Sequence, residues 1–263
     1  MSFYGSSFSF DGISCEEYGL MLYDFNNTSM KASEFTTGMD VIEDRLPQRA
    51  RSLFYGTGYK DPLEFTLVFG VADSSEPIDR QEMEVFASWL TEHDDYKWLT
   101  IDQEDMVGIR YRCIMTDLKM LEFAGDKWAL SCEVHCDSPF AYTLPEKFSY
   151  TVNGTADVVL HSRSSSNRPY YPPTTIALNG SSDFSVVNHS DGNYEIKFTG
   201  VPQTSDVVDI DSENGVITAS SGLNVYPNFN FKFPRLVRGD NHLTITGKGT
   251  ITFVCEFPVN VGG

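Results

Sequence analysis

Short runs of alternating apolar and polar residues recur along this chain and constrain its fold more than any other feature. Residues 63–69 alternate strictly, and residues 130–136 do the same. Alternation with a period of two places one face of a β-strand in a core and the other in solvent. A seam at residues 136–142, with the sequence CDSPFAY, separates two groups of such runs. The pattern therefore predicts a mainly β chain of two units, residues 1–145 and residues 146–263.

One segment of the first unit has helical periodicity instead. Cap-forming residues and a proline occur at residues 73–77, as they do before many helices. An apolar stripe then follows at helical spacing and consists of Met83, Phe86, Trp89 and Leu90. The sequence predicts one short helix near residues 76–92, with this stripe packed in the core.

The second unit carries about eight short strand patterns separated by turns, with no helical pattern. Residues 148–152 and 157–160 are predicted as separate strands, because Asn153-Gly154-Thr155 between them is typical of a turn. Residues 224–233 are predicted as a further strand with its odd positions facing inward. Asn214-Gly215 is the strongest hairpin signal of the chain. These features predict a β-sandwich.

Charge and hydropathy exclude several classes of protein. The formal net charge is -18, from 37 acidic and 19 basic residues, and such a surface repels phosphate backbones. Sequence-independent binding of nucleic acid and docking on anionic lipid are therefore disfavoured. No apolar run reaches the ~18 residues that a membrane-spanning helix needs. The N-terminal residues lack the basic start and apolar region of a secretory signal, so we expect the chain to fold in a cytoplasm.

The five cysteines, at positions 15, 113, 132, 136 and 255, are expected to be buried thiols. Cys132 and Cys136 share one face of a predicted strand at a separation of ~13 Å, because each residue of a strand adds roughly 3.3 Å. A disulfide needs Cα atoms within about 7 Å. His135 points to the opposite face, so these three residues cannot hold zinc together. No metal or cofactor is predicted.

No arrangement of residues predicts catalysis. The chain lacks a Gly-x-Ser-x-Gly elbow, and its acidic residues are scattered rather than paired in the sequence. Residues 209–215 faintly resemble a calcium loop, but Gly215 comes one place late and Ser220 stands where that loop has glutamate. A hairpin turn explains residues 209–215 better. We therefore expect a building block or a binding protein rather than an enzyme.

Two sets of residues are candidates for contacts with partners. Residues 43–61 are polar and are predicted to form a long hairpin with residues 63–69, with positive charge at its tip. This local reversal of charge suggests a subunit or tube interface, and a solvated loop is the alternative; the residues are Arg45, Arg49, Arg51 and Lys60. The exposed candidates for stacking on a sugar are Tyr170, Tyr171 and Tyr226, for which packing in the core or in turns is the alternative.

The order of these features resembles one known family. The opening at residues 8–20, the helix ending in Ser88-Trp89-Leu90, the seam, and residues 236–247 with Gly239-x-Asn241 before a strand carry the likeness. In this order and spacing, they resemble the distal tail protein, Dit, of long-tailed siphophages. The resemblance spans nearly the whole chain. Residues 254–258 depart from it, because they lack the longer charged and aromatic tail of many members.

The resemblance implies a β-rich N-terminal domain that assembles six copies into a ring, followed by a galectin-like C-terminal β-sandwich. It implies a virion protein at the distal end of the tail that joins the tail tube to tail-tip or baseplate proteins. The implied partners are other copies of the chain, the tail tube protein, a tail-associated (Tal-like) protein, the tape-measure protein and a receptor-binding protein. No catalysis, cofactor or reading of DNA sequence is implied. The rival hypothesis is a carbohydrate-binding adhesin for a cell-wall glycan.

Overall fold

A computed structural model describes residues 6–23, 39–59, 61–72, 77–123 and 126–261 of the chain. These residues are mainly β, with one α-helix among the described segments, which confirms the predicted fold class. The chain divides into two compact units. Unit 1 comprises residues 1–142 and 260–263, and unit 2 comprises residues 143–259.

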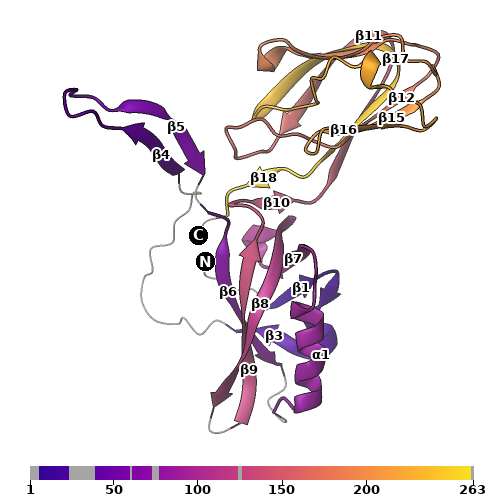
Figure 1. The fold of residues 1–263 in the computed structure, drawn as a ribbon. Helices are drawn as coiled ribbons and strands as arrows, with labels where there is room; N and C mark the ends of the chain where they lie inside the picture. The colour runs from indigo at the N-terminus through magenta and orange to yellow at the C-terminus, as the bar shows by residue number, and fades with distance from the viewer. Residues whose placement is uncertain (1–5, 24–38, 60, 73–76, 124–125, 262–263) are drawn as a thin grey trace. The chain divides into compact units, whose positions relative to one another are not determined.

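Unit 1 is built on an antiparallel sheet in which seven strands follow the order β2-β1-β7-β8-β9-β6-β3 (Figure 1). In β6 the buried Phe65, Leu67 and Phe69 alternate with more exposed neighbours. This alternation is the one seen in the sequence, and it directs one face of the sheet into the core. The bounds are β1 (Ser7–Phe10), β2 (Ile13–Ser14), β3 (Leu20–Leu22), β6 (Glu64–Val71), β7 (Lys97–Asp102), β8 (Ile109–Phe123) and β9 (Asp126–Cys136). Short 3-10 turns η1 (Cys15–Tyr18) and η2 (Glu104–Met106) connect them, and β10 (Ala141–Thr143) follows where the chain enters unit 2.

The helix α1 (Arg80–Thr91) lies against this sheet (Figure 1), and its buried Trp89 makes contact with β1. The Trp89 ring stacks 5.8 Å from Phe8 and lies 4.7 Å from Tyr18, and its Nε1 donates to the Phe10 carbonyl at 3.3 Å. The helix begins later than the predicted residue 76, because Asp79 caps it. The Asp79 carboxylate accepts the Glu82 N–H at 2.8 Å, and the Glu82 carboxylate accepts the Asp79 N–H at 2.9 Å.

Strands β4 (Met39–Asp44) and β5 (Leu53–Tyr59) form a separate two-stranded sheet, here called the hairpin. The two strands pair from Met39↔Tyr59 to Asp44↔Leu53, with an irregularity at Ile42/Glu43. The prediction that residues 43–61 pair with residues 63–69 was therefore wrong. The strand β6 pairs instead with β3 and β9, because its buried face belongs to the core of unit 1.

Unit 2 has the strand order β14-β13-β17-β12-β15-β16, with β11 paired to β17 on the other side. The strand β17 pairs with β11 along its whole length; on its second edge it pairs first with β13 and then with β12. The bounds are β11 (Glu146–Ser162), β12 (Thr174–Leu178), β13 (Phe184–Asn188), β14 (Tyr194–Phe198), β15 (Val207–Asp211), β16 (Val216–Ala219), β17 (Gly239–Cys255) and β18 (Pro258–Val259). The turns η3 (His189–Asp191) and η4 (Tyr226–Asn228) are 3-10 helical.

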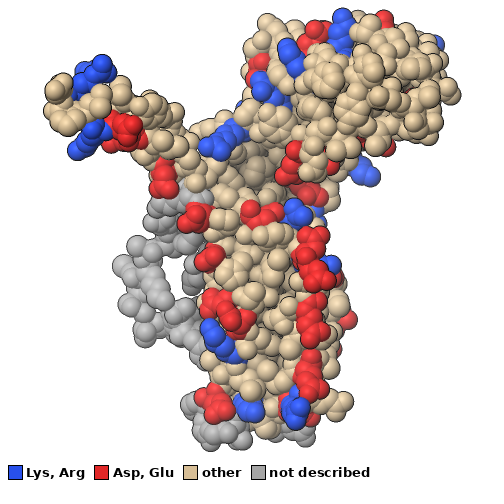
Figure 2. Space-filling view, viewed as in Figure 1, with Lys and Arg blue, Asp and Glu red and all other residues tan. Residues whose placement is uncertain are grey.

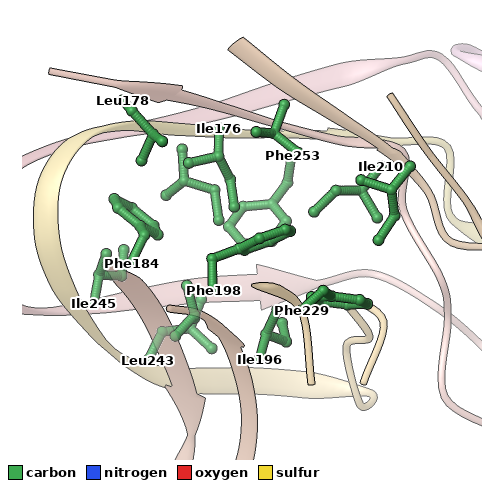
Figure 3. Close-up of a cluster of buried hydrophobic side chains, with 14 of the residues drawn as sticks. Ile176, Leu178, Phe184, Ile196, Phe198, Ile210, Phe229, Leu243, Ile245 and Phe253 are labelled. Atoms are coloured by element: carbon green, nitrogen blue, oxygen red, sulfur yellow. The ribbon is translucent and has the colours of Figure 1, made fainter. Parts of the chain in front are cut away.

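The β11/β17 ribbon changes layers at two glycines of β17, and this change closes the sandwich. A Cβ atom on Gly247 would lie 2.6 Å from the Phe184 ring, and one on Gly249 would lie 2.3 Å from the Ala177 carbonyl oxygen. Only glycine permits these approaches to β13 and β12. Between the layers, Ile176, Leu178 and Phe253 face Phe184, Phe198 and Ile245 in one apolar core (Figure 3).

Two local predictions in unit 2 were wrong, although the sandwich is confirmed. Residues 148–152 and 157–160 are parts of the single strand β11, because Asn153, Gly154 and Thr155 stay paired with Lys248, Gly247 and Thr246. Residues 224–233 form no continuous strand. Val225 and Phe229 are buried there, but Pro227 lies in the 3-10 turn η4, and only Phe229 makes a β-bridge.

Candidate assembly surface

Among the described residues of unit 1, the hairpin carries the largest group of exposed apolar side chains. Every residue of β4 is exposed, and Phe54 and Tyr55 of β5 are 64% and 63% exposed. Val41 and Ile42 on the opposing strand are 59% and 53% exposed. A lone two-stranded hairpin is at best marginally stable in water, and clustered exposed apolar side chains mark interaction sites. The hairpin is therefore a candidate surface for contact with another chain.

The turn of the hairpin places three predicted interface residues together. Arg45, Arg49 and Arg51 lie in the segment between β4 and β5 and are all exposed. Figure 2 shows basic side chains at this end of the hairpin. Arg45 lies 3.9 Å from the Glu43 carboxylate, whereas Arg49 and Arg51 have no ion pair among the described residues. Lys60, the fourth predicted residue, lies outside the described residues. The turn thus presents positive charge beside the apolar strands.

An acidic surface, which the sequence analysis missed, covers the solvent side of α1. Arg80 is the only lysine or arginine among residues 79–95, and it pairs with Glu84 at 3.3 Å. Acidic side chains gather in this part of unit 1 (Figure 2). The exposed acidic residues of this α1 surface are Asp79, Glu82, Glu84, Glu92, Asp94 and Asp95. A count of charges on the polar face of the predicted helix would have revealed it.

The seam forms a polar and aromatic cluster inside unit 1. The Asp137 carboxylate accepts from Arg112 and from the Tyr142 hydroxyl, both at 3.3 Å. The Tyr142 ring lies edge-on to Trp98, whose face carries the Arg110 guanidinium 3.6 Å from the ring centre. Burial raises the pKa of the Asp137 carboxyl, and the charge of Arg112 opposes this rise. These contacts anchor the end of unit 1 rather than form an open site.

The three candidate tyrosines of unit 2 have separate surroundings. The Tyr170 hydroxyl accepts the Glu256 N–H at 2.9 Å, and the ring packs 5.5 Å from Phe257. The Tyr226 hydroxyl accepts the Ile217 N–H at 2.8 Å and donates to the Gly215 carbonyl at 3.4 Å. Tyr171 is 39% exposed. Two of the three hydroxyls are thus committed to holding backbone, which favours the packing alternative for Tyr170 and Tyr226.

The five cysteines are buried and free, as predicted. Burial raises the pKa of the Cys132, Cys136 and Cys255 thiols to about 12. No cluster of His, Cys, Asp or Glu suited to a metal occurs among the described residues. No helix among the residues that the structure describes is long and apolar enough to cross a membrane.

The segment that faintly resembles a calcium loop is a turn between β15 and β16. The Asp211 carboxylate accepts the backbone N–H groups of Glu213 and Asn214 at 3.1 and 3.0 Å and the Asn214 amide at 2.7 Å. These hydrogen bonds, led by the Asn214 amide, hold the pKa of Asp211 below its ordinary value. The Asp211 carboxylate therefore closes the turn between β15 and β16, as the sequence suggested.

Both halves of the sequence match family models. Residues 3–138 match the phage tail protein N-terminal domain, and residues 140–255 match the phage tail C-terminal domain. A solved structure with a similar fold is the Dit protein of phage SPP1, described as a paradigm of the hub adsorption apparatus in phages that infect Gram-positive bacteria. It covers 95% of this chain and 98% of its own, with a TM-score of 0.69 and 13% sequence identity. No curated protein sequence matches the chain.

Proposed function

Because this chain belongs to a family of phage tail proteins, matched through both its N-terminal and C-terminal domains, we propose that it forms the hub at the distal end of a long tail. In this proposal, residues 1–145 assemble six copies into a ring, and residues 146–263 form a galectin-like sandwich. The fold shared with SPP1 Dit supports this assignment. The role is structural and requires no catalysis.

The observation that carries the proposal is the hairpin, which exposes apolar side chains on both strands. Phe54, Tyr55 and Val41 are each more than half exposed. Burial of apolar surface contributes roughly 25 cal/mol per Å². A hairpin that packs on a neighbouring copy therefore gains the stability that a lone two-stranded hairpin lacks. A ring requires a heterologous interface, in which one surface of each copy meets a different surface of the next. The hairpin is suited to be the first of these surfaces.

The acidic α1 surface is the complement that we propose on the next copy. Arg45, Arg49 and Arg51 oppose the charge of the chain as a whole, whose formal net charge is -18. Copies of so acidic a chain repel one another unless opposite charges meet at their contacts. The α1 surface supplies acidic residues with one basic side chain among them. Complementary charge of this kind fixes the orientation of partners more than it adds affinity.

The remaining partners follow from a position in the tail. The ring would meet the tail tube protein on one face and a tail-associated (Tal-like) protein on the other, with a receptor-binding protein attached nearby. The tape-measure protein and the DNA would pass through the lumen without being read. Assembly would take place in the cytoplasm of the host bacterium, and the finished protein would reside in the virion.

Electron microscopy of negatively stained, purified full-length chain tests the proposal. Class averages with six-fold symmetry and a central channel are expected. Uniform single particles of the size of one chain, at all concentrations that give usable images, would contradict a ring that forms from this chain alone.

A further inference from the structure

An open hollow of about 540 Å³ lies on unit 2, over the strands β14, β13, β17 and β11. This volume falls within the range of small-molecule sites, roughly 300–1,000 Å³. The pairing of the strands aligns four lining residues in one row, Lys197↔Ser185↔Thr246↔Thr155. Paired residues share a face of the sheet, and this face is the solvent side, because the neighbouring Phe184 is buried in the core.

Two lysines give the hollow a positive character in an acidic chain. Lys197 stands at one end of the row, and Lys248 follows Thr246 by two residues and so shares its face. The Lys248 Nζ atom reaches to 3.9 Å from the Cβ position of Gly180. Neither lysine makes an ion pair within the described part of the chain. Two unpaired ammonium groups in one hollow favour an anionic ligand.

The carboxylate that also lines the hollow is already engaged. The Asp183 Oδ1 atom accepts the Gly200 N–H at 2.7 Å, which ties it to the loop after β14. Around it are hydroxyl groups suited to a ligand that carries hydroxyls of its own. The Thr155 and Thr246 hydroxyls lie 3.2 Å apart, and Ser181 and Ser185 complete the wall.

Glycine leaves the backbone open on one side of the hollow. Gly154 has a φ of +116°, and no atom lies within 4 Å of the position that its Cβ would take. Unlike Gly247, it is therefore not required by packing against a neighbouring strand. Glycine in a strand often marks a place where a ligand approaches the backbone closely.

A second hollow of about 350 Å³ continues along the same strands. It is lined by Asp157 of β11 and Thr244 of β17. Asp157 lies two residues after Thr155, and Thr244 lies two residues before Thr246, so both share the face of the first hollow. The Thr244 hydroxyl donates to Asp157 at 2.6 Å and meets His189 Nε2 at 2.8 Å. The ring of His242 has no hydrogen-bond partner within the described residues. This end can bind hydroxyl groups, while the carboxylate of Asp157 would repel an anion.

We propose that this face of unit 2 binds an acidic saccharide. Its phosphate or carboxylate group would lie between Lys197 and Lys248, and the hydroxyls of the same sugar unit would face Thr155 and Thr246. A further unit of a longer saccharide would face His242. This site is separate from the predicted tyrosines, and it goes beyond the hub function because it does not require a ring.

Isothermal titration calorimetry on the full-length chain at low salt tests this inference. The probes are glucose 6-phosphate, glucuronate, glucose and inorganic phosphate. We expect at least one of the two acidic sugars to bind about tenfold more tightly than both glucose and phosphate, and to weaken as salt is added. Which acidic sugar binds will identify the anionic group. Phosphate that binds as tightly as the acidic sugars, or absence of binding by both sugars at millimolar concentrations, would overturn the proposal.

Single substitutions locate the site. Lys197→Gln and Lys248→Gln should each weaken binding of the acidic sugar by about tenfold, because each removes one charge from the hollow. Lys147→Gln is the matched control, since Lys147 is an exposed lysine of β11 outside the hollow. Native mass and melting temperature should be unchanged in all three variants, which separates this test from that of the ring. Equal binding by Lys147→Gln and the two hollow variants would place the ligand elsewhere.

Discussion

Gly249 of β17 approaches Ala177 of β12 so closely that a Cβ atom on Gly249 would lie 2.3 Å from the Ala177 carbonyl oxygen. The pairing Gly249↔Leu178 begins the contact between these two strands, immediately after β17 leaves β13 at Gly247. The two layers of the sandwich are therefore joined at a position where a side chain cannot fit.

Gly249→Ala should destabilise unit 2 by about 1–3 kcal/mol, because the added methyl group forces the backbone of β12 away. Gly154→Ala is the matched control. Its φ is also positive, at +116°, but its Cβ would meet no atom within 4 Å. Thermal unfolding followed by circular dichroism should show the larger loss for Gly249→Ala. Equal losses in the two variants would show that backbone strain, and not contact with Ala177, sets the cost.

Reversal of charge at the hairpin should weaken assembly. The triple variant Arg45→Glu, Arg49→Glu, Arg51→Glu would place acidic side chains against the acidic α1 surface of the neighbour. Each exposed ion pair contributes about 0.2–1 kcal/mol, so we expect the midpoint of assembly to shift by roughly tenfold in concentration. Sedimentation at a series of concentrations measures this shift.

The partner surface is identified by a compensating change. Glu84→Lys with Asp94→Lys adds positive charge to the α1 surface and leaves the capping pair of Asp79 and Glu82 intact. Combined with the arginine reversal, it should restore much of the lost assembly, since opposite charges would meet again. If the combined variant assembles no better than the arginine reversal alone, the hairpin meets a surface other than α1.

Loss of an apolar side chain from the hairpin should affect assembly but not folding. Phe54 is 64% exposed, so Phe54→Ser should change the stability of one chain by no more than about 0.5 kcal/mol. In the proposed hexamer the Phe54 side chain would be buried between two copies, so its loss should lower the assembled fraction. Val107→Ser is a control, because Val107 is 82% exposed in the same unit and lies outside the hairpin. The idea fails if both variants assemble like the unchanged chain.

The buried thiols predict a fall in stability at high pH. A thiol has an ordinary pKa of 9.0, and burial raises that of Cys132 and Cys136 to about 12. Between these values the unfolded chain loses protons that the folded chain keeps. The contribution of the thiols to the free energy of unfolding should therefore be constant below pH 9 and should decrease from pH 9 towards 12. Urea unfolding at increasing pH measures this trend.

The same burial should protect the thiols from reagents. Iodoacetamide reacts with thiolates, and a neutral, inaccessible thiol reacts slowly. Mass spectrometry should therefore find the native chain unmodified near pH 8 and all five cysteines modified after denaturation. Rapid modification of Cys132 in the native chain would contradict its buried position.

Local patterns predicted the elements well and their partners poorly. The alternation around Phe65 and Leu67 and the stripe at Trp89 reflect burial of one face, which a sequence records directly. The pairing of Gly154 with Gly247 is different, because the two residues are remote in the sequence and the turn-like triplet at 153–155 gave no sign of it. Pairing depends on contacts made across the whole chain.

The candidate surfaces show the same division. The reversal of charge at Arg45, Arg49 and Arg51 is visible in the sequence, because these residues are neighbours. The row from Lys197 to Thr155 crosses four strands, and no local pattern links its members. Tyr170 was a candidate for sugar contact in the sequence, with packing as the alternative, and its hydroxyl accepts the backbone N–H of Glu256.

The native mass of the purified full-length chain, measured by light scattering over a range of concentrations, tests the central claim most directly. The account predicts a species of six times the chain mass of 29.5 kDa, or a pair of such rings. It also predicts that charge reversal at the hairpin lowers this mass. A strict monomer at every concentration would contradict a hub that closes through contacts between copies of this chain alone.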